Sequence, residues 1–128
     1  MVEQTPARIL VVDDEDAIRR TLAVLLERRG YTVAAAANAE EALAWLVQRA
    51  FDLVLVDLQL PGMNGLELAR IVAGQQPSAK IVVLTGSSDF RGRPIEEQVG
   101  HFDYLLKTTS PADVLAHVAT ILASQPRE

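Results

Sequence analysis

The stretch ILVVDDED, residues 9–16, runs four apolar residues directly into four acidic ones. Consecutive branched aliphatic residues without alternation are typical of a strand that is covered on both faces of a sheet. The acidic residues follow where such a strand would end, at the edge of the sheet where polar sites form. Because carboxylates gathered at one place repel each other, we expect a cation to hold them together.

Similar apolar runs recur along the chain and alternate with longer segments of helical spacing. The runs that predict strands are residues 9–12, 31–36, 53–56, 80–84 and 104–106. Alternation of short buried strands with helices is typical of parallel βα units. We therefore expect an α/β protein with five parallel strands.

Capping residues and the spacing of apolar side chains place the helix boundaries. A helix after the acidic stretch would end at Gly30, because glycine adopts the left-handed conformation of a C′ residue without penalty. A second would begin at Asn38, whose side chain can accept a hydrogen bond from a free amide. Its expected buried face consists of Leu43, Leu46 and Val47. The last would follow Ser110, with Pro111 at its first position.

The segment between the fourth and fifth predicted strands is irregular. Gly92 and Pro94 interrupt the apolar spacing that a regular helix there would need. Proline is tolerated best in the first turn of a helix. We expect a short helix that begins near Pro94, with a loop before it.

Size and composition narrow the function classes. With 128 residues, 49% of them hydrophobic and 23% charged, the chain suits a single domain with its core at about residues 7–123 and polar tails at both ends. A net charge of -5 at pH 7 argues against direct binding to nucleic acid or to an anionic membrane. The lack of cysteine excludes disulfides. With no apolar leader or span in view, we expect a cytoplasmic protein.

Polar residues end four of the five predicted strands. Asp13 and Asp14 follow the first strand, Asp57 the third, Thr85 the fourth and Lys107 the fifth. The carboxyl ends of parallel strands meet at one edge of the sheet, so these side chains should lie together. Oxygen ligands in small number suit Mg²⁺, while a lysine and a hydroxyl suit phosphoryl oxygens. The set predicts a phosphoryl site.

The motifs also carry a family resemblance that covers nearly the whole chain. DDED after the first strand, LVLVDLQLPGMNGLEL around the third, VVLTG at the fourth and DYLLK at the fifth resemble a chemotaxis-regulator-like receiver domain of two-component response regulators. The resemblance implies a flavodoxin-like (βα)5 fold, a doubly wound parallel sheet with strand order 2-1-3-4-5. It also implies a signalling domain that is activated by phosphorylation.

The resemblance assigns the acidic residues. Asp57 would be the phosphoacceptor, and Asp14 and Asp57 would bind Mg²⁺, or Mn²⁺, directly. Asp13 would act on the ion through water, and the backbone carbonyl of Gln59 would complete the protein's share of the ligands. Positioning and charge neutralisation by these groups are what phosphoryl transfer to a carboxylate needs.

The resemblance also assigns the switch and the partners. Lys107 would pair with a phosphoryl oxygen, and Gly86 would leave room for the phosphoryl group and contact it. Thr85 would be drawn toward the phosphoryl group, and Tyr104 would turn inward behind it. The donor would be a sensor histidine kinase or a phosphotransfer protein, and small phosphodonors often replace it. The output partner stays unknown, with dimerisation on phosphorylation as one form of output; the domain would assist its own phosphorylation and dephosphorylation without being an enzyme in the ordinary sense.

Two places depart from the family pattern. Members usually have a cis proline after the lysine, whereas Thr108 follows Lys107, and a cis bond there would cost about 3 kcal/mol. We expect a trans bond and a loop of different shape. The irregular stretch around Gly92, together with His101 where a small residue is common, lies on the face that usually carries dimer or output contacts.

Two other functions stay open. The first is a receiver-fold docking domain that works without phosphorylation; the intact acids argue against it, and the missing proline leaves it open. The second is an Mg²⁺ phosphatase of the haloacid dehalogenase type, which also uses an aspartate nucleophile after a strand. Such an enzyme needs a second acid two residues later, where this chain has Gln59, which cannot act as a general acid.

Overall fold

The computed structural model describes residues 6–87, 89–90, 92–100 and 102–123, so most of both expected tails and His101 lie outside the described residues. Five long parallel strands form the central sheet: β1 (Arg8–Val12), β2 (Thr32–Ala36), β3 (Leu53–Asp57), β6 (Lys80–Thr85) and β9 (Asp103–Leu106). They lie in the order β2-β1-β3-β6-β9, which is the predicted order 2-1-3-4-5 of a flavodoxin-like fold. The predicted fold class is therefore confirmed.

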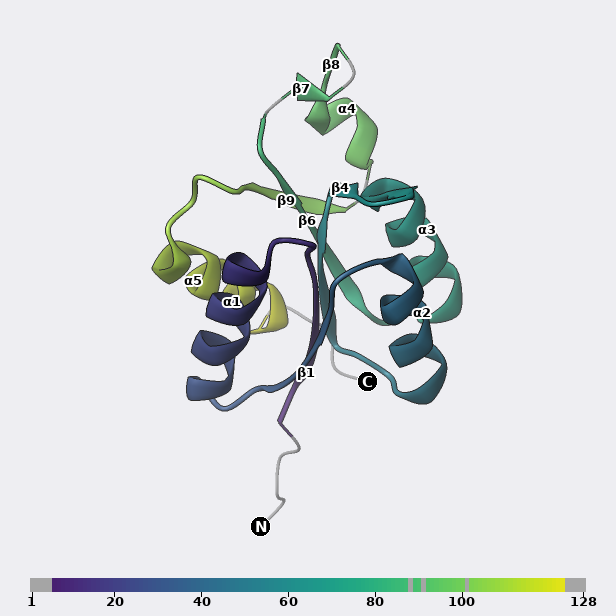
Figure 1. The fold of residues 1–128 in the computed structure, drawn as a ribbon. Helices are drawn as coiled ribbons and strands as arrows, with labels where there is room; N and C mark the ends of the chain where they lie inside the picture. The colour runs from purple at the N-terminus through teal and green to yellow at the C-terminus, as the bar shows by residue number, and fades with distance from the viewer. Residues whose placement is uncertain (1–5, 88, 91, 101, 124–128) are drawn as a thin grey trace.

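Helices cover both faces of this sheet. The helices are α1 (Asp16–Arg28), α2 (Ala39–Gln48), α3 (Gly65–Gln75), α4 (Ile95–Val99) and α5 (Pro111–Ala123). In Figure 1, α1 and α5 lie on one side of the sheet, and α2 and α3 lie on the other. None of the helices in the described part of the chain is long and apolar enough to cross a membrane.

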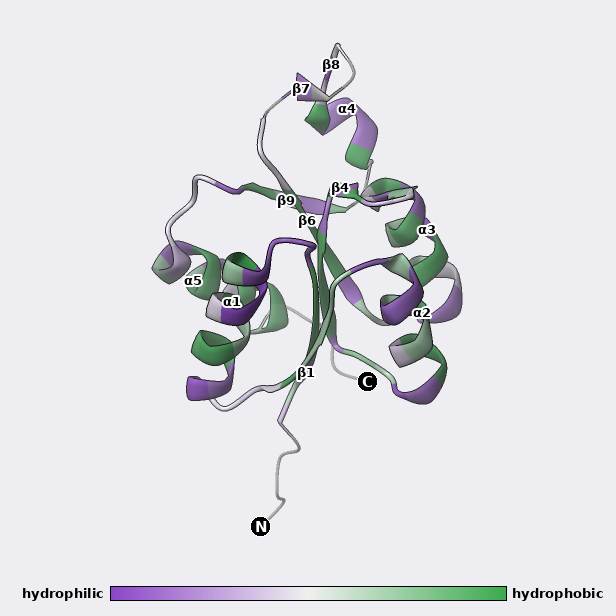
Figure 2. Ribbon diagram, in the orientation of Figure 1, coloured by the Kyte–Doolittle hydropathy of each residue, from purple (hydrophilic) through white to green (hydrophobic). Residues whose placement is uncertain are grey.

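Successive strand residues pack into two different cores, because side chains alternate across a sheet. Ile9, Val11, Leu53 and Leu55 face α1 and α5, whereas Leu10, Val12, Val54 and Val56 face the opposite core. All eight side chains are fully buried, which explains why these runs show no polar alternation. Figure 2 shows the apolar strands leading into a hydrophilic loop after β1. Asp57 continues the row of Leu53 and Leu55, so the alternation directs it to the side of the sheet that α1 and α5 cover.

The predicted caps of the first two helices are present. Gly30 has φ +97° after α1, as expected of a C′ glycine. The side chain of Asn38 accepts a hydrogen bond of 2.9 Å from the amide of Glu41 at the start of α2. The prediction for Val47 is wrong, since its side chain is 76% exposed. Ala39, Ala42 and Leu46 form the buried face at spacings of three and four residues, and Val47 lies one residue beyond that face.

The turn after β3 shapes the edge of the sheet. Strands β4 (Gln59–Leu60) and β5 (Met63–Asn64) pair as a short hairpin, in which Gly62 has φ +74°. Gly65 is needed for a different reason, because a Cβ there would stand 2.1 Å from the backbone oxygen of Asp57. The first residue of α3 thus packs directly against the backbone of Asp57.

The irregular region before α4 contains a second hairpin. Strands β7 (Asp89–Phe90) and β8 (Arg93–Pro94) pair around Gly92, which has φ +77°. The short helix α4 then begins directly after Pro94, as predicted, but a hairpin stands where a plain loop was expected. No cis peptide bond occurs among the described residues, so the bond from Lys107 to Thr108 is trans, as expected.

Candidate functional site

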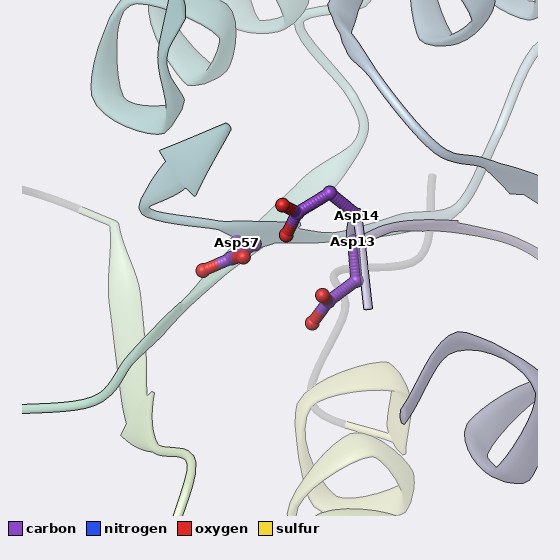
Figure 3. A group of neighbouring side chains, drawn as sticks. All are labelled: Asp13, Asp14 and Asp57. Carbon is purple, nitrogen blue, oxygen red and sulfur yellow. The ribbon is translucent and has the colours of Figure 1, made fainter. Parts of the chain in front are cut away.

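Three carboxylates meet at the carboxyl end of the sheet. Asp13 and Asp14 follow β1, and Asp57 ends β3; Figure 3 shows their side chains close together. One carboxylate oxygen from each lies within 4.8 Å of the other two. Asp13 and Asp57 are buried, at 0% and 3% exposure, whereas Asp14 is exposed. Two buried carboxylates beside a third concentrate negative charge at this site, and nearby cations are needed to offset it.

Lys107 supplies a positive charge at this edge. Its Nζ lies 3.0 Å from Oδ2 of Asp57 and 3.3 Å from Oδ2 of Asp13. The backbone holds it there, because the amide of Lys107 donates a 2.7 Å hydrogen bond to the carbonyl of Thr85 in β6. The structure thus brings together the residues that the sequence placed at this edge.

Burial sets the protonation of Asp57. Removal from water raises the pKa of the Asp57 carboxyl to about 6, because burial disfavours the charged form. The hydrogen bond from Lys107 acts in the opposite direction, and the charge of Asp13 adds to the rise. The carboxylate is therefore mostly ionised at pH 7, as a nucleophile must be, but its charged form is held at a cost.

Lys107 stays protonated. Burial alone would lower the pKa of its ammonium group, but hydrogen bonds to Glu15 and Asp57, together with the charges of Asp57 and Asp13, raise that pKa well above its usual range. A permanent positive charge beside Asp57 suits the binding of a phosphoryl oxygen.

Two residues at this edge were not found by sequence reasoning. The carboxylate of Glu15 lies 2.8 Å from Nζ of Lys107, a contact between residues 92 positions apart. Arg19 donates from Nη1 to the backbone carbonyl of Asp13 at 2.8 Å and also pairs with the carboxylate of Asp16. The spacing of three residues between Asp16 and Arg19 on a helix could have indicated that pair. Nothing in the local sequence indicates the contact of Glu15.

Thr85 and its neighbours form the wall of the site on β6. Thr85 is buried, and its hydroxyl both donates to the carbonyl of Ser87 at 2.9 Å and accepts from the amide of Ser87 at 3.3 Å. Gly86 is exposed, and no atom of the described residues lies within 4 Å of where its Cβ would stand. Tyr104 is half-buried and packs against the core on the α2 and α3 side. The hydroxyl of Thr85 is therefore engaged locally, and the space beside Gly86 is open.

The donor set fits a divalent cation. A cavity of about 380 Å³ opens at the carboxylates and is lined by Asp14, Glu15, Asp57, Gln59, Leu60, Pro61 and Lys107. Oδ2 of Asp13 is buried and accepts no hydrogen bond in the described part of the chain; Nζ of Lys107, 3.3 Å away, faces it as an ion pair only. A buried carboxylate oxygen without a donor is costly, and hard oxygen ligands in small number are those that Mg²⁺ prefers. The amide of Gln59 donates to Oδ1 of Asp57 at 3.2 Å, which keeps that residue beside the cavity.

Known proteins resemble this chain over nearly its whole length. A family model described as the response regulator receiver domain matches residues 9–119. The transcriptional regulatory protein ResD of Bacillus subtilis is 36% identical over 122 residues, which are 95% of this chain and 50% of ResD. The chain thus spans about half the length of that relative.

Solved structures agree with the observed fold. A CheY-like response regulator receiver domain protein from Methanospirillum hungatei superposes with a TM-score of 0.85 at 34% identity, over 94% of this chain and 97% of that one. A response regulator protein from Burkholderia pseudomallei, solved with a phosphorylated aspartic acid, a calcium ion and citrate, has a TM-score of 0.77 at 36% identity, over 91% of this chain and 69% of that one.

Proposed function

This chain belongs to the response regulator receiver family, whose members are phosphorylated on an aspartate in two-component signalling, and from that premise we propose that Asp57 is its phosphoacceptor. One observation carries the proposal. Asp57 is the buried carboxylate that both lies 3.0 Å from the permanent cation Lys107 and lines the open cavity, whereas the buried Asp13 does not line it. Its neighbours at the strand ends leave an open cavity beside it into which a phosphodonor can reach.

Phosphoryl transfer here needs positioning more than acid or base chemistry. An oxygen of the ionised Asp57 carboxylate attacks the phosphorus, and a new phosphorus–oxygen bond forms. The bond from phosphorus to the donor's imidazole nitrogen, or to the acetate oxygen of acetyl phosphate, breaks, and the donor keeps the electron pair. Lys107, 3.0 Å from Oδ2 of Asp57, neutralises charge on the phosphoryl oxygens.

A divalent cation belongs to the same proposal. Asp14 and Asp57 would hold Mg²⁺, or Mn²⁺, directly, Asp13 would hold it through water, and the carbonyl of Gln59 would add a ligand. The bound ion would supply charge neutralisation between the carboxylates and the phosphoryl oxygens. Oδ2 of Asp13 supports this assignment, because it is buried and accepts no hydrogen bond among the described residues, although Nζ of Lys107 lies 3.3 Å away.

The change on phosphorylation would begin at Thr85. Its hydroxyl now bonds to Ser87, and a phosphoryl group on Asp57 would offer that hydroxyl a charged acceptor in exchange. Gly86 leaves the approach open and would contact the phosphoryl group. Tyr104, which is half-buried beside the same strand, would turn inward as Thr85 moves. The altered face would then bind an output partner or a second copy of the chain.

Membership in the family supports a proposal for the donor and for the output. We propose a sensor histidine kinase or a phosphotransfer protein as the donor, and Gln59 and Ser87, which flank the site, would influence how long the phosphoryl group lasts. The curated relative is a transcriptional regulator about twice as long as this chain, so a partner or a further domain would carry the output. The chain would assist its own phosphorylation and dephosphorylation without turning over other substrates.

The test is intact mass spectrometry after incubation with acetyl phosphate and Mg²⁺. We expect the mass of one phosphoryl group to be added, to be lost when Mg²⁺ is chelated, and to be absent in Asp57→Asn. Since some receivers take phosphate only from their protein partner, a purified phosphohistidine donor is the second arm. Failure of both arms would contradict the proposal and leave the docking domain that works without phosphorylation.

A further inference from the structure

The side chain of Glu15 contacts Lys107 and does not cap the helix that follows it. It occupies the N-cap position of α1, yet its carboxylate makes no capping hydrogen bond. Its Oε1 instead lies 2.8 Å from Nζ of Lys107, closer than either Asp57 at 3.0 Å or Asp13 at 3.3 Å. An acidic side chain at an N-cap normally accepts amide hydrogens of the first turn. The geometry here gives that stabilisation up for a long-range contact.

The ammonium group of Lys107 is surrounded by carboxylates. An ammonium has three N–H donors, and the carboxylates of Asp13, Glu15 and Asp57 all lie within 3.3 Å of its nitrogen. A phosphoryl group on Asp57 brings new anionic oxygens to the same lysine. The carboxylates that keep their contacts with Lys107 then compete with those oxygens for its N–H donors.

Glu15 is the contact that can be released at least cost. Its side chain is 57% exposed, whereas those of Asp13 and Asp57 are 0% and 4% exposed. Water can replace the lysine at an exposed carboxylate, but the buried Asp13 would lose the cation that faces it, and Asp57 is itself the group that carries the phosphoryl oxygens. Glu15 also lines the cavity beside Asp57, so its negative charge faces the place where an anionic group would enter.

We propose that Glu15 is a positioning residue that holds Lys107 in the unphosphorylated state and releases it to the phosphoryl group, an inference that rests on the proposed function of Asp57. Glu15 therefore competes with phosphoryl oxygens for the lysine. Its removal leaves one N–H donor of Lys107 available to them, so phosphorylation becomes easier and the unphosphorylated lysine, still beside Asp13 and Asp57, becomes more mobile. Exposed ion pairs are worth little, which sets the expected gain at about two- to five-fold.

Three variants separate the contact from the charge. Glu15→Gln removes the charge and weakens the contact. Glu15→Asp keeps the charge but is one methylene shorter, and aspartate is a preferred N-cap, so its carboxylate should turn to the amides of α1. Glu27→Gln removes the same charge from an exposed position near the far end of α1 and is the matched control.

The first readout needs no metal and no phosphoryl group. NMR order parameters of the lysine ammonium nitrogen report how firmly Lys107 is held. We expect them to fall in Glu15→Gln and in Glu15→Asp and to stay unchanged in Glu27→Gln. Equal order in the wild type and both Glu15 variants would overturn the proposal.

The second readout is the affinity for beryllofluoride, a stable mimic of a phosphoryl group, measured by NMR titration with Mg²⁺ present. We expect both Glu15 variants to bind it about two- to five-fold more tightly than the wild type, with Glu27→Gln unchanged. Equal or weaker binding by both variants would overturn the proposed role of Glu15 and would leave the proposed function of Asp57 standing. If the wild type bound no beryllofluoride and accepted no phosphate from either donor, the proposed function of Asp57 would fail, and the role of Glu15 with it.

Discussion

The two ends of the central sheet treat their polar groups in opposite ways. At the amino end, the side chain of Gln76 accepts from the amide of Phe51 at 2.7 Å and donates to the carbonyls of Leu46 and Arg49 at 3.0 and 2.7 Å. At the carboxyl end, Oδ2 of the buried Asp13 has no hydrogen-bond partner among the described residues. Both polar atoms of the Gln76 side chain thus have hydrogen-bond partners in other segments. The acids at the other end of the sheet instead share a single lysine.

The difference shows that polar groups at one end of the sheet stabilise the fold, whereas those at the other end form the candidate site. Asp52 at the amino end accepts a 2.7 Å hydrogen bond from the amide of Arg8 and so joins the strands β1 and β3 near their start. Asp57 at the opposite end of β3 is buried beside Asp13; burial first, and the charge of Asp13 second, raise the pKa of its carboxyl. Polar groups that are fully paired stabilise a fold. Groups left in excess at one edge suit the cation and the phosphoryl group that we propose for it.

The largest expected effect is that of removing the cation from the acidic end. Lys107→Ala should slow phosphorylation of Asp57 by acetyl phosphate about 100-fold or more, because loss of one group that stabilises transition-state charge has effects of that size. Lys80→Ala, at the amino end of β6, is the control and should leave the rate unchanged. The measurement is the initial rate by intact mass. Equal rates in the two variants would contradict the proposal that only the carboxyl end of the sheet takes part in phosphorylation.

The next effect concerns the amino end. Gln76→Ala removes three hydrogen bonds and leaves the amide of Phe51 without its partner, so we expect a loss of about 2 to 3 kcal/mol in the free energy of unfolding. Phosphorylation of the folded fraction should not change. Gln48→Ala, on the exposed surface of α2, is the matched control. Urea denaturation measures the loss, and a drop below 0.5 kcal/mol, on the order of a neutral surface change, would contradict the structural role of Gln76.

A smaller effect of opposite sign is expected at Asp57. Its pKa is about 6 in the folded protein and 3.8 as the ordinary value, so the folded state binds more protons between these values and stability falls as the pH rises through them. Asp57→Asn removes this penalty and should be more stable than the wild type at pH 7, on the order of 2 kcal/mol without Mg²⁺.

The pH dependence provides the check. The advantage of Asp57→Asn should shrink toward pH 4, where the wild-type carboxyl is protonated in the folded state. It should also shrink at pH 7 when Mg²⁺ is added, because the ion would stabilise the wild-type carboxylate by binding it. Asp52→Asn is the control and should gain no stability, since its carboxylate accepts the amide hydrogen of Arg8. If Asp57→Asn were less stable than the wild type at pH 7, the ionised carboxylate of Asp57 would not destabilise the folded protein, contrary to this prediction.

Much of the fold could be predicted because its signals are local. Unbroken runs of Val, Leu and Ile indicate strands covered on both faces, and the strands lie where such runs were found. The caps at Asn38 and Gly30 follow from single side chains and their immediate neighbours. Val47 shows the limit of the pattern, since an apolar residue one position beyond a helix face reads as part of that face until the helix is oriented.

The acidic edge could be predicted as a set but not in its contacts. Parallel strands bring their carboxyl ends together, so Asp13, Asp14, Asp57 and Lys107 were expected to meet, and they do. The contact between Glu15 and Lys107 depends on side-chain reach across 92 positions, which no local spacing encodes. Gly65 is similar, because its need for a missing Cβ is visible only once α3 lies against Asp57. The roles given to the site residues, from Asp13, Asp14, Asp57, Thr85 and Lys107 to Gln59, Gly86 and Tyr104, all stay predictions.

We propose that Asp57 alone among the acids at the carboxyl end of the sheet accepts the phosphoryl group. The most direct test is to locate the modified residue. The protein is treated with acetyl phosphate and Mg²⁺, the acyl phosphate is reduced with borohydride, which converts the modified aspartate to homoserine, and peptides are mapped by mass spectrometry. We predict homoserine at position 57 and at no other acid, and none when Mg²⁺ is chelated. Homoserine at position 13 or 14, or modification that is indifferent to Mg²⁺, would contradict the account.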